Sequence, residues 1–148
     1  LYAARRIGER LLVVGEQGLV LTSDDGGASF RALASPYKGS WFTAEMLSAD
    51  AWVIAGLRGN VWRTADGGAT WQQIPSPAGA SITASALDAE GQLLLGNQAG
   101  IVLRAEAGGL RALNDKPTTA IAALAFDDKK SLWALTMTGP VPVATANP

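Results

Sequence analysis

The carboxylates most open to a chemical interpretation lie in two glycine-rich turns. Asp24 and Asp25 precede Gly26, and Asp66 precedes Gly67. Clustered carboxylates next to glycine are typical of calcium-binding loops, but these turns lack the ligand series and the terminal glutamate that such loops need. We therefore predict no metal site in them and no cofactor.

Histidine and cysteine are both absent from the chain. Their absence removes the commonest general base, every Ser-His triad, disulfides and thiolate chemistry. A sialidase-like glycosidase would need an arginine cluster for the substrate carboxylate, with tyrosine, glutamate and aspartate for the chemistry. Only Tyr2 and Tyr37 are available, and neither has an evident glutamate partner in the sequence. We therefore predict no catalytic residues and no enzymatic activity.

The same turns belong to a repeat. Residues 23–30, SDDGGASF, recur as residues 64–71, TADGGATW, and Val20, Val61 and Val102 follow one another at the same spacing. A fixed period of roughly 40 residues is typical of propellers and solenoids.

Each residue type in the repeated turn has a structural use. An aspartate can accept hydrogen bonds from the backbone of its own turn, glycines allow positive φ, and the aromatic residue can anchor the hairpin. We therefore assign the motif a structural role. Its residues are Ser23, Asp25, Gly27, Phe30, Thr64, Asp66, Gly68 and Trp71.

Short apolar runs broken by glycine predict four strands in each repeat. The expected first strands are 2–7, 41–47, 82–87 and 121–126, the second strands 11–14, 51–55, 92–95 and 132–135, the third strands 19–22, 60–64, 101–104 and 141–144, and the fourth strands 30–33, 71–74 and 110–113. The second strands are almost wholly apolar, while the fourth mix polar and apolar residues, as expected for inner and outer strands of a propeller blade.

We therefore predict an all-β propeller of four-stranded antiparallel blades. About 3.5 blades fit into a single partial domain over residues 1–148, at about 1–34, 40–75, 81–114 and, incomplete, 120–148. An open row of blades leaves sheet faces exposed at both ends. We expect a homodimer or the remaining blades of a longer chain to cover them.

Charge and hydropathy exclude two classes of partner. The chain has 12 basic and 13 acidic residues and a net charge of −1. This balance lacks the basic footprint of a nucleic-acid-binding protein, so we predict no nucleic acid. No apolar run reaches the roughly 18 residues of a membrane span, so we predict no spanning segment.

Residues 15–30 and 56–71 follow the pattern G-x-x-G-x-[IVL]-x-x-[ST]-x-D-G-G-x-[ST]-[WF]. This pattern resembles the Asp box, or bacterial neuraminidase repeat. It is similar to repeats of the photosystem II stability/assembly-factor family and its relatives in non-photosynthetic bacteria. A third copy at 105–112 is degraded, because Ala107 replaces the aspartate and Ala112 the aromatic residue. The resemblance covers almost the whole chain.

The resemblance implies a non-catalytic propeller, often of about seven blades, that is exported or periplasmic and binds a protein client as a scaffold. In the photosynthetic members an arginine-rich surface contacts the client, and Arg58, Arg63 and Arg104 are the corresponding arginines here. Two alternatives stay open: a fragment of a sialidase-like glycoside hydrolase and a carbohydrate-binding propeller.

Topology places the candidate binding surface without the family. In a four-stranded meander, the 2–3 turns and the loops between blades emerge at the end opposite the Asp boxes, and loops on a rigid scaffold are where binding concentrates. The candidate residues at this end are Gln17, Tyr37, Lys38, Trp41, Arg58, Gln98 and Lys116. We expect Trp41 to be the exposed aromatic platform, and Trp52 and Trp133 to occupy corresponding positions in the core between blades.

Overall fold

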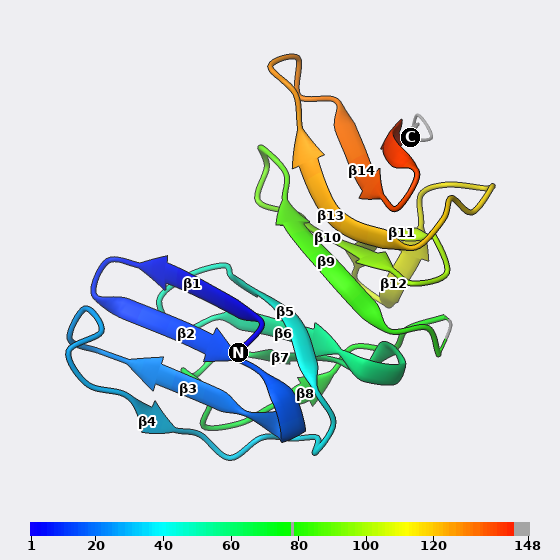
Figure 1. The fold of residues 1–148 in the computed structure, drawn as a ribbon. Coiled ribbons are helices and arrows are strands. Elements are labelled where there is room, and N and C mark those ends of the chain that lie inside the picture. The colour runs from blue at the N-terminus through cyan, green and yellow to red at the C-terminus, as the bar shows by residue number, and fades with distance from the viewer. Residues whose placement is uncertain (78, 144–148) are drawn as a thin grey trace.

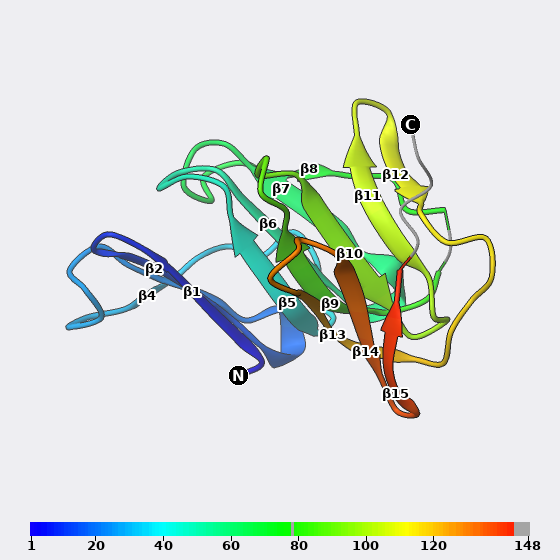
Figure 2. The same ribbon diagram turned by 90° about the horizontal axis from the view of Figure 1, so that it is seen from above.

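The structure is a computed structural model that describes residues 1–77 and 79–143. It consists of four antiparallel sheets that follow one another as the blades of an incomplete propeller (Figures 1 and 2). Blade 1 contains β1 (Ala3–Ile7), β2 (Arg10–Val14), β3 (Val20–Ser23) and β4 (Arg31–Ala32), and blade 2 contains β5 (Trp41–Met46), β6 (Trp52–Gly56), β7 (Val61–Thr64) and β8 (Gln72–Gln73). Blade 3 contains β9 (Ile82–Leu87), β10 (Leu93–Asn97), β11 (Val102–Glu106) and β12 (Gly109–Ala112), and blade 4 contains β13 (Ile121–Phe126), β14 (Leu132–Thr136) and β15 (Gly139–Pro142). Two short 3₁₀ turns, η1 (Glu16–Gly18) and η2 (Leu57–Gly59), join β2 to β3 and β6 to β7.

Each blade pairs its strands in chain order, and burial falls from the second strand to the fourth. Every residue of β6 and of β10 is buried, whereas β4 and β8 are two residues long and exposed. The predicted propeller of about 3.5 blades and its gradient of burial are confirmed. In the described part of the chain, no helix has the length and apolar character needed to cross a membrane.

Alternation along the second strands builds the cores between blades. Leu12 and Val14 of β2 face blade 2, where they pack with Trp52 and Ile54. The intervening residues of β6, Val53 and Ala55, face blade 3 and pack with Leu93 and Leu95. A third cluster joins blades 3 and 4 through Leu94, Leu132 and Ala134. The second strands of the two middle blades, β6 and β10, are therefore buried on both faces because a neighbouring blade covers each face.

Trp41 is not an exposed platform, and that prediction is wrong. Its side chain is fully buried in the core between blades 1 and 2, and its Nε1 donates to Ser35 Oγ at 3.0 Å. Trp41 pairs with Gly56 at the start of β5, next to a bulge. There the indole turns into the core rather than toward the loops.

Trp133 also differs from the prediction. Trp52 pairs with Met46 and Leu132 with Phe126, so Leu132 is the residue that corresponds to Trp52. Trp133 lies one residue further along and therefore points to the opposite face of its sheet. It is half-buried, and its Nε1 donates to Asp127 Oδ2 at 3.1 Å.

The third strand of blade 4 begins earlier than predicted. The tight turn after β14 pairs Thr136 with Gly139, so β15 covers residues 139–142 instead of 141–144. Residue 144 of the expected strand lies outside the described residues.

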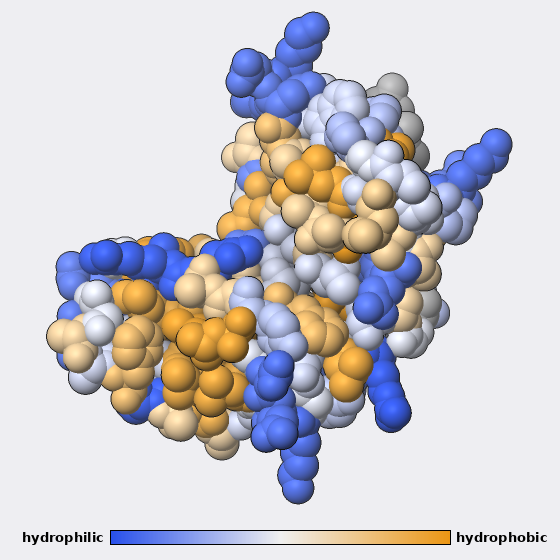
Figure 3. All heavy atoms as spheres, in the orientation of Figure 1, coloured by the Kyte–Doolittle hydropathy of each residue, from blue (hydrophilic) through white to orange (hydrophobic). Residues whose placement is uncertain are grey.

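The first and last blades each present an apolar face that none of the described blades covers. On blade 1, Leu11 and Val13 occupy the positions at which Trp52 and Ile54 enter the core of blade 2, with Ala4 and Leu21 in register beside Val13. On blade 4, the uncovered face is the opposite one and carries Trp133, Leu135, Pro140 and Pro142. Figure 3 shows hydrophobic residues gathered over both blades. The face of blade 1 corresponds to the side that blade 2 turns toward blade 1, and the face of blade 4 to the side that blade 2 turns toward blade 3. Each is thus one side of a blade-to-blade contact without its partner among the described blades.

Candidate functional site

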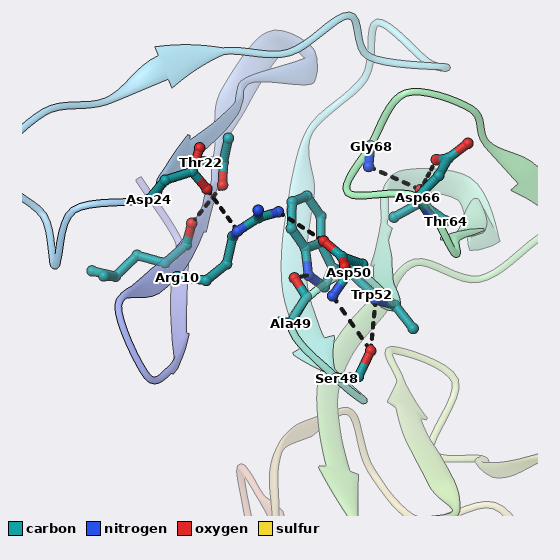
Figure 4. Close-up of polar contacts among 12 residues, drawn as sticks. Arg10, Thr22, Asp24, Ser48, Ala49, Asp50, Trp52, Thr64, Asp66 and Gly68 are labelled. Atoms are coloured by element: carbon teal, nitrogen blue, oxygen red, sulfur yellow. Dashed lines mark hydrogen bonds and ion pairs between the residues drawn. The ribbon is translucent and has the colours of Figure 1, made fainter.

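The Asp-box turns make the hydrogen bonds expected of the motif. Asp66 accepts from the backbone N–H and the hydroxyl of Thr70, at 2.8 and 2.6 Å, and from the Thr64 hydroxyl at 2.7 Å. Thr64 Oγ1 in turn accepts from the Gly68 N–H at 2.9 Å (Figure 4). These bonds, led by the one from the Thr70 hydroxyl, lower the pKa of Asp66 to about 2. The carboxylate therefore stays ionised and is used to close its own turn.

Blade 1 repeats this arrangement. Asp25 accepts from Ser29 N at 2.9 Å, from Ser29 Oγ at 2.5 Å and from Ser23 Oγ at 2.7 Å. The hydrogen bond from the Ser29 hydroxyl is the main reason why the pKa of Asp25 lies well below its usual range. The aromatic anchors are less alike: Phe30 is 46% exposed, whereas Trp71 packs against the core between blades 1 and 2.

The degraded third copy forms a shorter hairpin. Glu106 pairs with Gly109, which leaves a two-residue turn in place of the longer loop between β3 and β4. Glu106 accepts from Arg111 Nε at 2.5 Å and from Arg104 Nη2 at 3.5 Å, and the hydrogen bond from Arg111 leads the lowering of its pKa. A cross-strand ion cluster thus stabilises a turn that has lost its aspartate.

At the opposite end, the 2–3 turns of the first three blades are hydrogen-bonded to the segments that connect blades. Two turns accept from residues at or before the first strand of the next blade: Trp41 N donates to Gly15 O and Thr118 N to Gly100 O, both at 3.0 Å. Two turns donate to the residue before the first strand of their own blade: Leu57 N donates to Ser40 O and Gln98 N to Ser81 O, both at 2.9 Å. These bonds hold the turns on the scaffold. Gln17 and Arg58 sit at the same point of η1 and η2, with φ of 54° and 58°, and both are exposed.

The structure groups the predicted loop residues by blade. The turn of Gln17 lies against Tyr37 and Lys38, since a Cβ on Gly18 would come within 2.5 Å of Tyr37 O and 3.2 Å of Lys38 Cα. The turn of Gln98 is joined to Lys116 by Asn114, whose Nδ2 donates to Gly100 O and to Lys116 O, both at 2.9 Å.

Arg58 belongs to the middle blade, where its backbone N–H donates to Ser81 Oγ at 3.1 Å. Gln98 takes the place of Leu57, because each donates its N–H to the residue that precedes the first strand of its own blade, and Ala99 takes the place of Arg58. We call the row formed by the exposed Gln17, Lys38, Arg58, Gln98 and Lys116 and the half-buried Tyr37 the loop face.

Tyr2 has a glutamate partner that was not predicted from the sequence. Its hydroxyl donates to Glu16 Oε1 at 2.9 Å, although 14 residues separate the two. This hydrogen bond raises the pKa of Tyr2, so the phenol holds its proton more tightly. In residues 1–77 and 79–143, Glu16 takes part in no ion pair, so the arginine cluster of a sialidase-like site does not accompany the pair.

Two polar clusters that cross between blades were also not predicted. Arg10 of β2 binds Asp24 through Nε at 2.6 Å and Asp50 of blade 2 through Nη1 at 3.1 Å, and its guanidinium lies 5.8 Å from the centre of the Trp52 ring (Figure 4). These four residues are the Arg10 cluster. It seals the junction of blades 1 and 2 at the Asp-box end.

The second cluster joins the first strands of three blades. Arg5 of β1 binds both carboxylate oxygens of Glu45 on β5, at 3.1 and 3.0 Å, and Ser85 of β9 donates to Glu45 Oε1 at 2.7 Å. Glu45 is buried, and such a charge needs these partners. Among the described residues, no group of three or more carboxylates is placed to hold a metal ion.

These features define a β-propeller with a structured loop face and an Asp-box end. No protein-family model and no curated protein sequence matches the chain. Among solved structures, the chain is similar to YCF48 bound to D1 peptide, with a TM-score of 0.70 and 20% identity over 90% of this chain and 45% of that one.

Two further propellers have the same arrangement of blades. The WD40 β-propeller domain of Doa1 matches with a TM-score of 0.80 and 9% identity, over 96% of this chain and 49% of that one. An ancestral GH74 enzyme matches with a TM-score of 0.78 and 12% identity, over 97% of this chain and 22% of that one. The chain spans about half the length of YCF48 and of the Doa1 domain. The propeller fold and the structural likeness to the photosystem II assembly factor YCF48 are thereby confirmed.

Proposed function

We propose that this chain acts as a non-catalytic propeller scaffold that binds a protein client through the loop face. The observation that carries the proposal is that backbone hydrogen bonds hold the 2–3 turns of the first three blades against the segments that connect blades. The bond of 2.9 Å from Leu57 N to Ser40 O is one of them. Binding to a surface that is already ordered loses less conformational entropy. The solved complex of YCF48 with D1 peptide supports a protein ligand for a propeller of this kind.

The chemistry of the loop face indicates an acidic client surface. Lys38, Arg58 and Lys116 are exposed and take part in no ion pair among the described residues. Exposed cations of this kind attract carboxylates and speed association, and salt weakens the effect. We also propose, on the family resemblance alone, that the protein is exported or periplasmic.

The loop face can be tested with an array of random dodecapeptides. We expect saturable binding of a subset rich in aspartate and glutamate, lost in a K38E/R58E/K116E variant and weakened by salt. Arg31→Glu is the control, because it reverses an exposed charge on blade 1 away from the loop face. An array on which the triple variant binds the same peptides as the unchanged chain would show that the loop face is not the client surface.

A glycoside hydrolase or carbohydrate-binding propeller is the second candidate, favoured by the Tyr2–Glu16 pair and by the GH74 neighbour. The burial of Trp41 removes the aromatic platform on which sugar binding would have depended. Hydrolysis of a fluorogenic sialoside that disappears in Tyr2→Phe would establish this candidate in place of the scaffold.

For the apolar faces of blades 1 and 4, we propose cover by further propeller blades, supplied by a second copy or by a longer chain. Leu11 and Val13 stand where Trp52 and Ile54 enter a core, and Trp133 stands on the complementary side. Each face therefore offers one apolar half of such a contact.

A further inference from the structure

The Arg10 cluster has no counterpart one repeat later. Moving each member along the chain by the spacing that separates Val20 from Val61 leads from Arg10 to Ala51, from Asp24 to Ala65, from Asp50 to Gly91 and from Trp52 to Leu93. The junction of blades 2 and 3 therefore lacks both carboxylates, the guanidinium and the indole that close the junction of blades 1 and 2.

Two adjoining hollows lie where those side chains are missing. One, of about 330 Å³, lies between blades 2 and 3 and is lined in part by Gly91 and Leu93. The other, of about 390 Å³, lies on blade 2 and is lined in part by Ala51 and Ala65. Their volumes are at the lower end of the range for ligand sites. Small residues in place of the Arg10 cluster account for the open space.

Three residues line both hollows and stand between them: Leu47, Arg63 and Gln72. Leu47 is a large apolar side chain that is 47% exposed. Arg63 and Gln72 are directly opposite each other on β7 and β8. We call these three residues and the two hollows the Arg63 groove. It offers an apolar contact next to a cation.

Arg63 differs from its equivalents in the other blades. Its Nε and Nη2 donate to the neutral Gln72 Oε1 at 3.1 and 2.7 Å, and in residues 1–77 and 79–143 it takes part in no ion pair. Arg104, at the same position of blade 3, binds Glu106, and blade 1 has the buried Thr22 there. The Nη1 N–H groups of Arg63 and one N–H of Nη2 are left for a ligand.

The other charges around the groove do not cancel that of Arg63. Glu106 also lines the first hollow, but Arg104 and Arg111 both bind its carboxylate. Asp50 lies in the turn between Leu47 and Ala51 and is bound by Arg10. The groove is therefore net positive, with one arginine lacking an acidic partner among the described residues.

We propose that the Arg63 groove binds an extended protein segment in which a carboxylate stands next to an apolar side chain. The carboxylate meets the free edge of the Arg63 guanidinium, a geometry that favours paired hydrogen bonds, and the apolar side chain covers Leu47. The proposal rests on the proposed function, that the chain binds proteins. It adds a second contact, at the end opposite the loop face.

The test is an NMR titration of the ¹⁵N-labelled chain with the peptide acetyl-Leu-Glu-Leu-amide. Two probes report on the groove: the Nε–H of Arg63 and the indole N–H of Trp71, which lines the second hollow and has no hydrogen-bond partner among the described residues. We expect saturable shifts of both signals. The affinity should fall by about tenfold or more in Arg63→Gln and for the matched peptide with Gln in place of Glu.

Arg31→Gln is the matched variant, since it removes an exposed arginine from the equivalent outer region of blade 1 and should bind as the unchanged chain does. Three results would each overturn the proposal: no shift of the two probe signals, an affinity of Arg63→Gln equal to that of the unchanged chain, or an affinity for the Gln peptide equal to that for the Glu peptide. The peptide array judges the loop face separately. Binding that depends on the loop-face lysines while the groove probes stay still would leave the proposed function intact and end this proposal.

Discussion

Arg10 of the first blade reaches Asp50 of the second, with 3.1 Å between Nη1 and Oδ1, and lies over the face of Trp52 on the way. The contact joins residues 40 positions apart and closes one junction between blades. The next junction has alanine and glycine at these positions and is hollow. Two copies of one repeat thus differ at the surface where a ligand can enter.

We expect Arg10→Gln to lower the free energy of unfolding by about 1 kcal/mol, because it removes two partly exposed ion pairs and a cation–π contact. Urea denaturation measures the change. Arg6→Gln is the control, since Arg6 makes only local, exposed contacts among the described residues, an ion pair with Glu9 at 3.6 Å and a hydrogen bond to Gly8 O. Equal stability of the two variants would mean that the Arg10 cluster adds nothing to the junction.

Asp66→Ala should lower the melting temperature while leaving peptide binding at the loop face unchanged. The substitution leaves the Thr70 N–H and the Thr64 hydroxyl without the acceptor that closes the turn. Thermal unfolding followed by circular dichroism gives the first quantity, and the peptide array gives the second. A variant that keeps its melting temperature but loses ligand would assign the Asp box a binding role instead.

Acid should destabilise the fold partly through the two Asp boxes. The folded-state pKa of Asp66 is about 2, below its ordinary 3.8, and the hydroxyl of Ser29 holds the pKa of Asp25 lower still. Because both values are depressed, their contribution is present above about pH 4 and is lost as the pH falls toward 2. Urea midpoints measured across this range should fall less steeply for a D25N/D66N variant. If the urea midpoints of the variant and of the unchanged chain fall equally with pH, the acid sensitivity does not come from Asp25 and Asp66.

Trp41→Ala should lower the free energy of unfolding by about 3–5 kcal/mol, the cost of emptying a buried aromatic site. Tyr37 is half-buried, and the centre of its ring lies 5.7 Å from that of Trp41. Tyr37→Ala should therefore lower the free energy of unfolding by less. Chemical denaturation compares the two. A small effect of Trp41→Ala would indicate that the indole is exposed in solution.

The apolar faces can be tested through the mass of the protein in solution. Light scattering on a sizing column should give about 31 kDa, twice the 15.3 kDa of the chain, if a second copy covers the faces. Trp133→Glu should then return the protein to a monomer, whereas Met137→Glu, an exposed change outside the face, should not. A monomer at every concentration would exclude a second copy as the cover of the two apolar faces and favour further blades of a longer chain.

The sequence by itself determined the repeat, the four-stranded blades and the Asp-box turns. These features depend on contacts within a few residues, such as Asp66 with Thr70, and on the apolar character of strands such as β6, which is the same on both faces. Local hydrogen bonding and the constant spacing of Val20, Val61 and Val102 are visible in the chain itself.

Only the tertiary structure decided which side chains meet across blades. A shift of one residue turns a strand side chain to the other face, and this placed Leu132 rather than Trp133 in the core. Trp41 is buried beside the bulge of β5, which the sequence does not reveal. Tyr2 with Glu16 joins separate elements, and Arg10 with Asp50 joins separate blades, so neither follows from spacing along the chain. The Arg63 groove exists because the junction of blades 2 and 3 lacks the large side chains of the Arg10 cluster. Only the assembled blades show that this leaves a hollow.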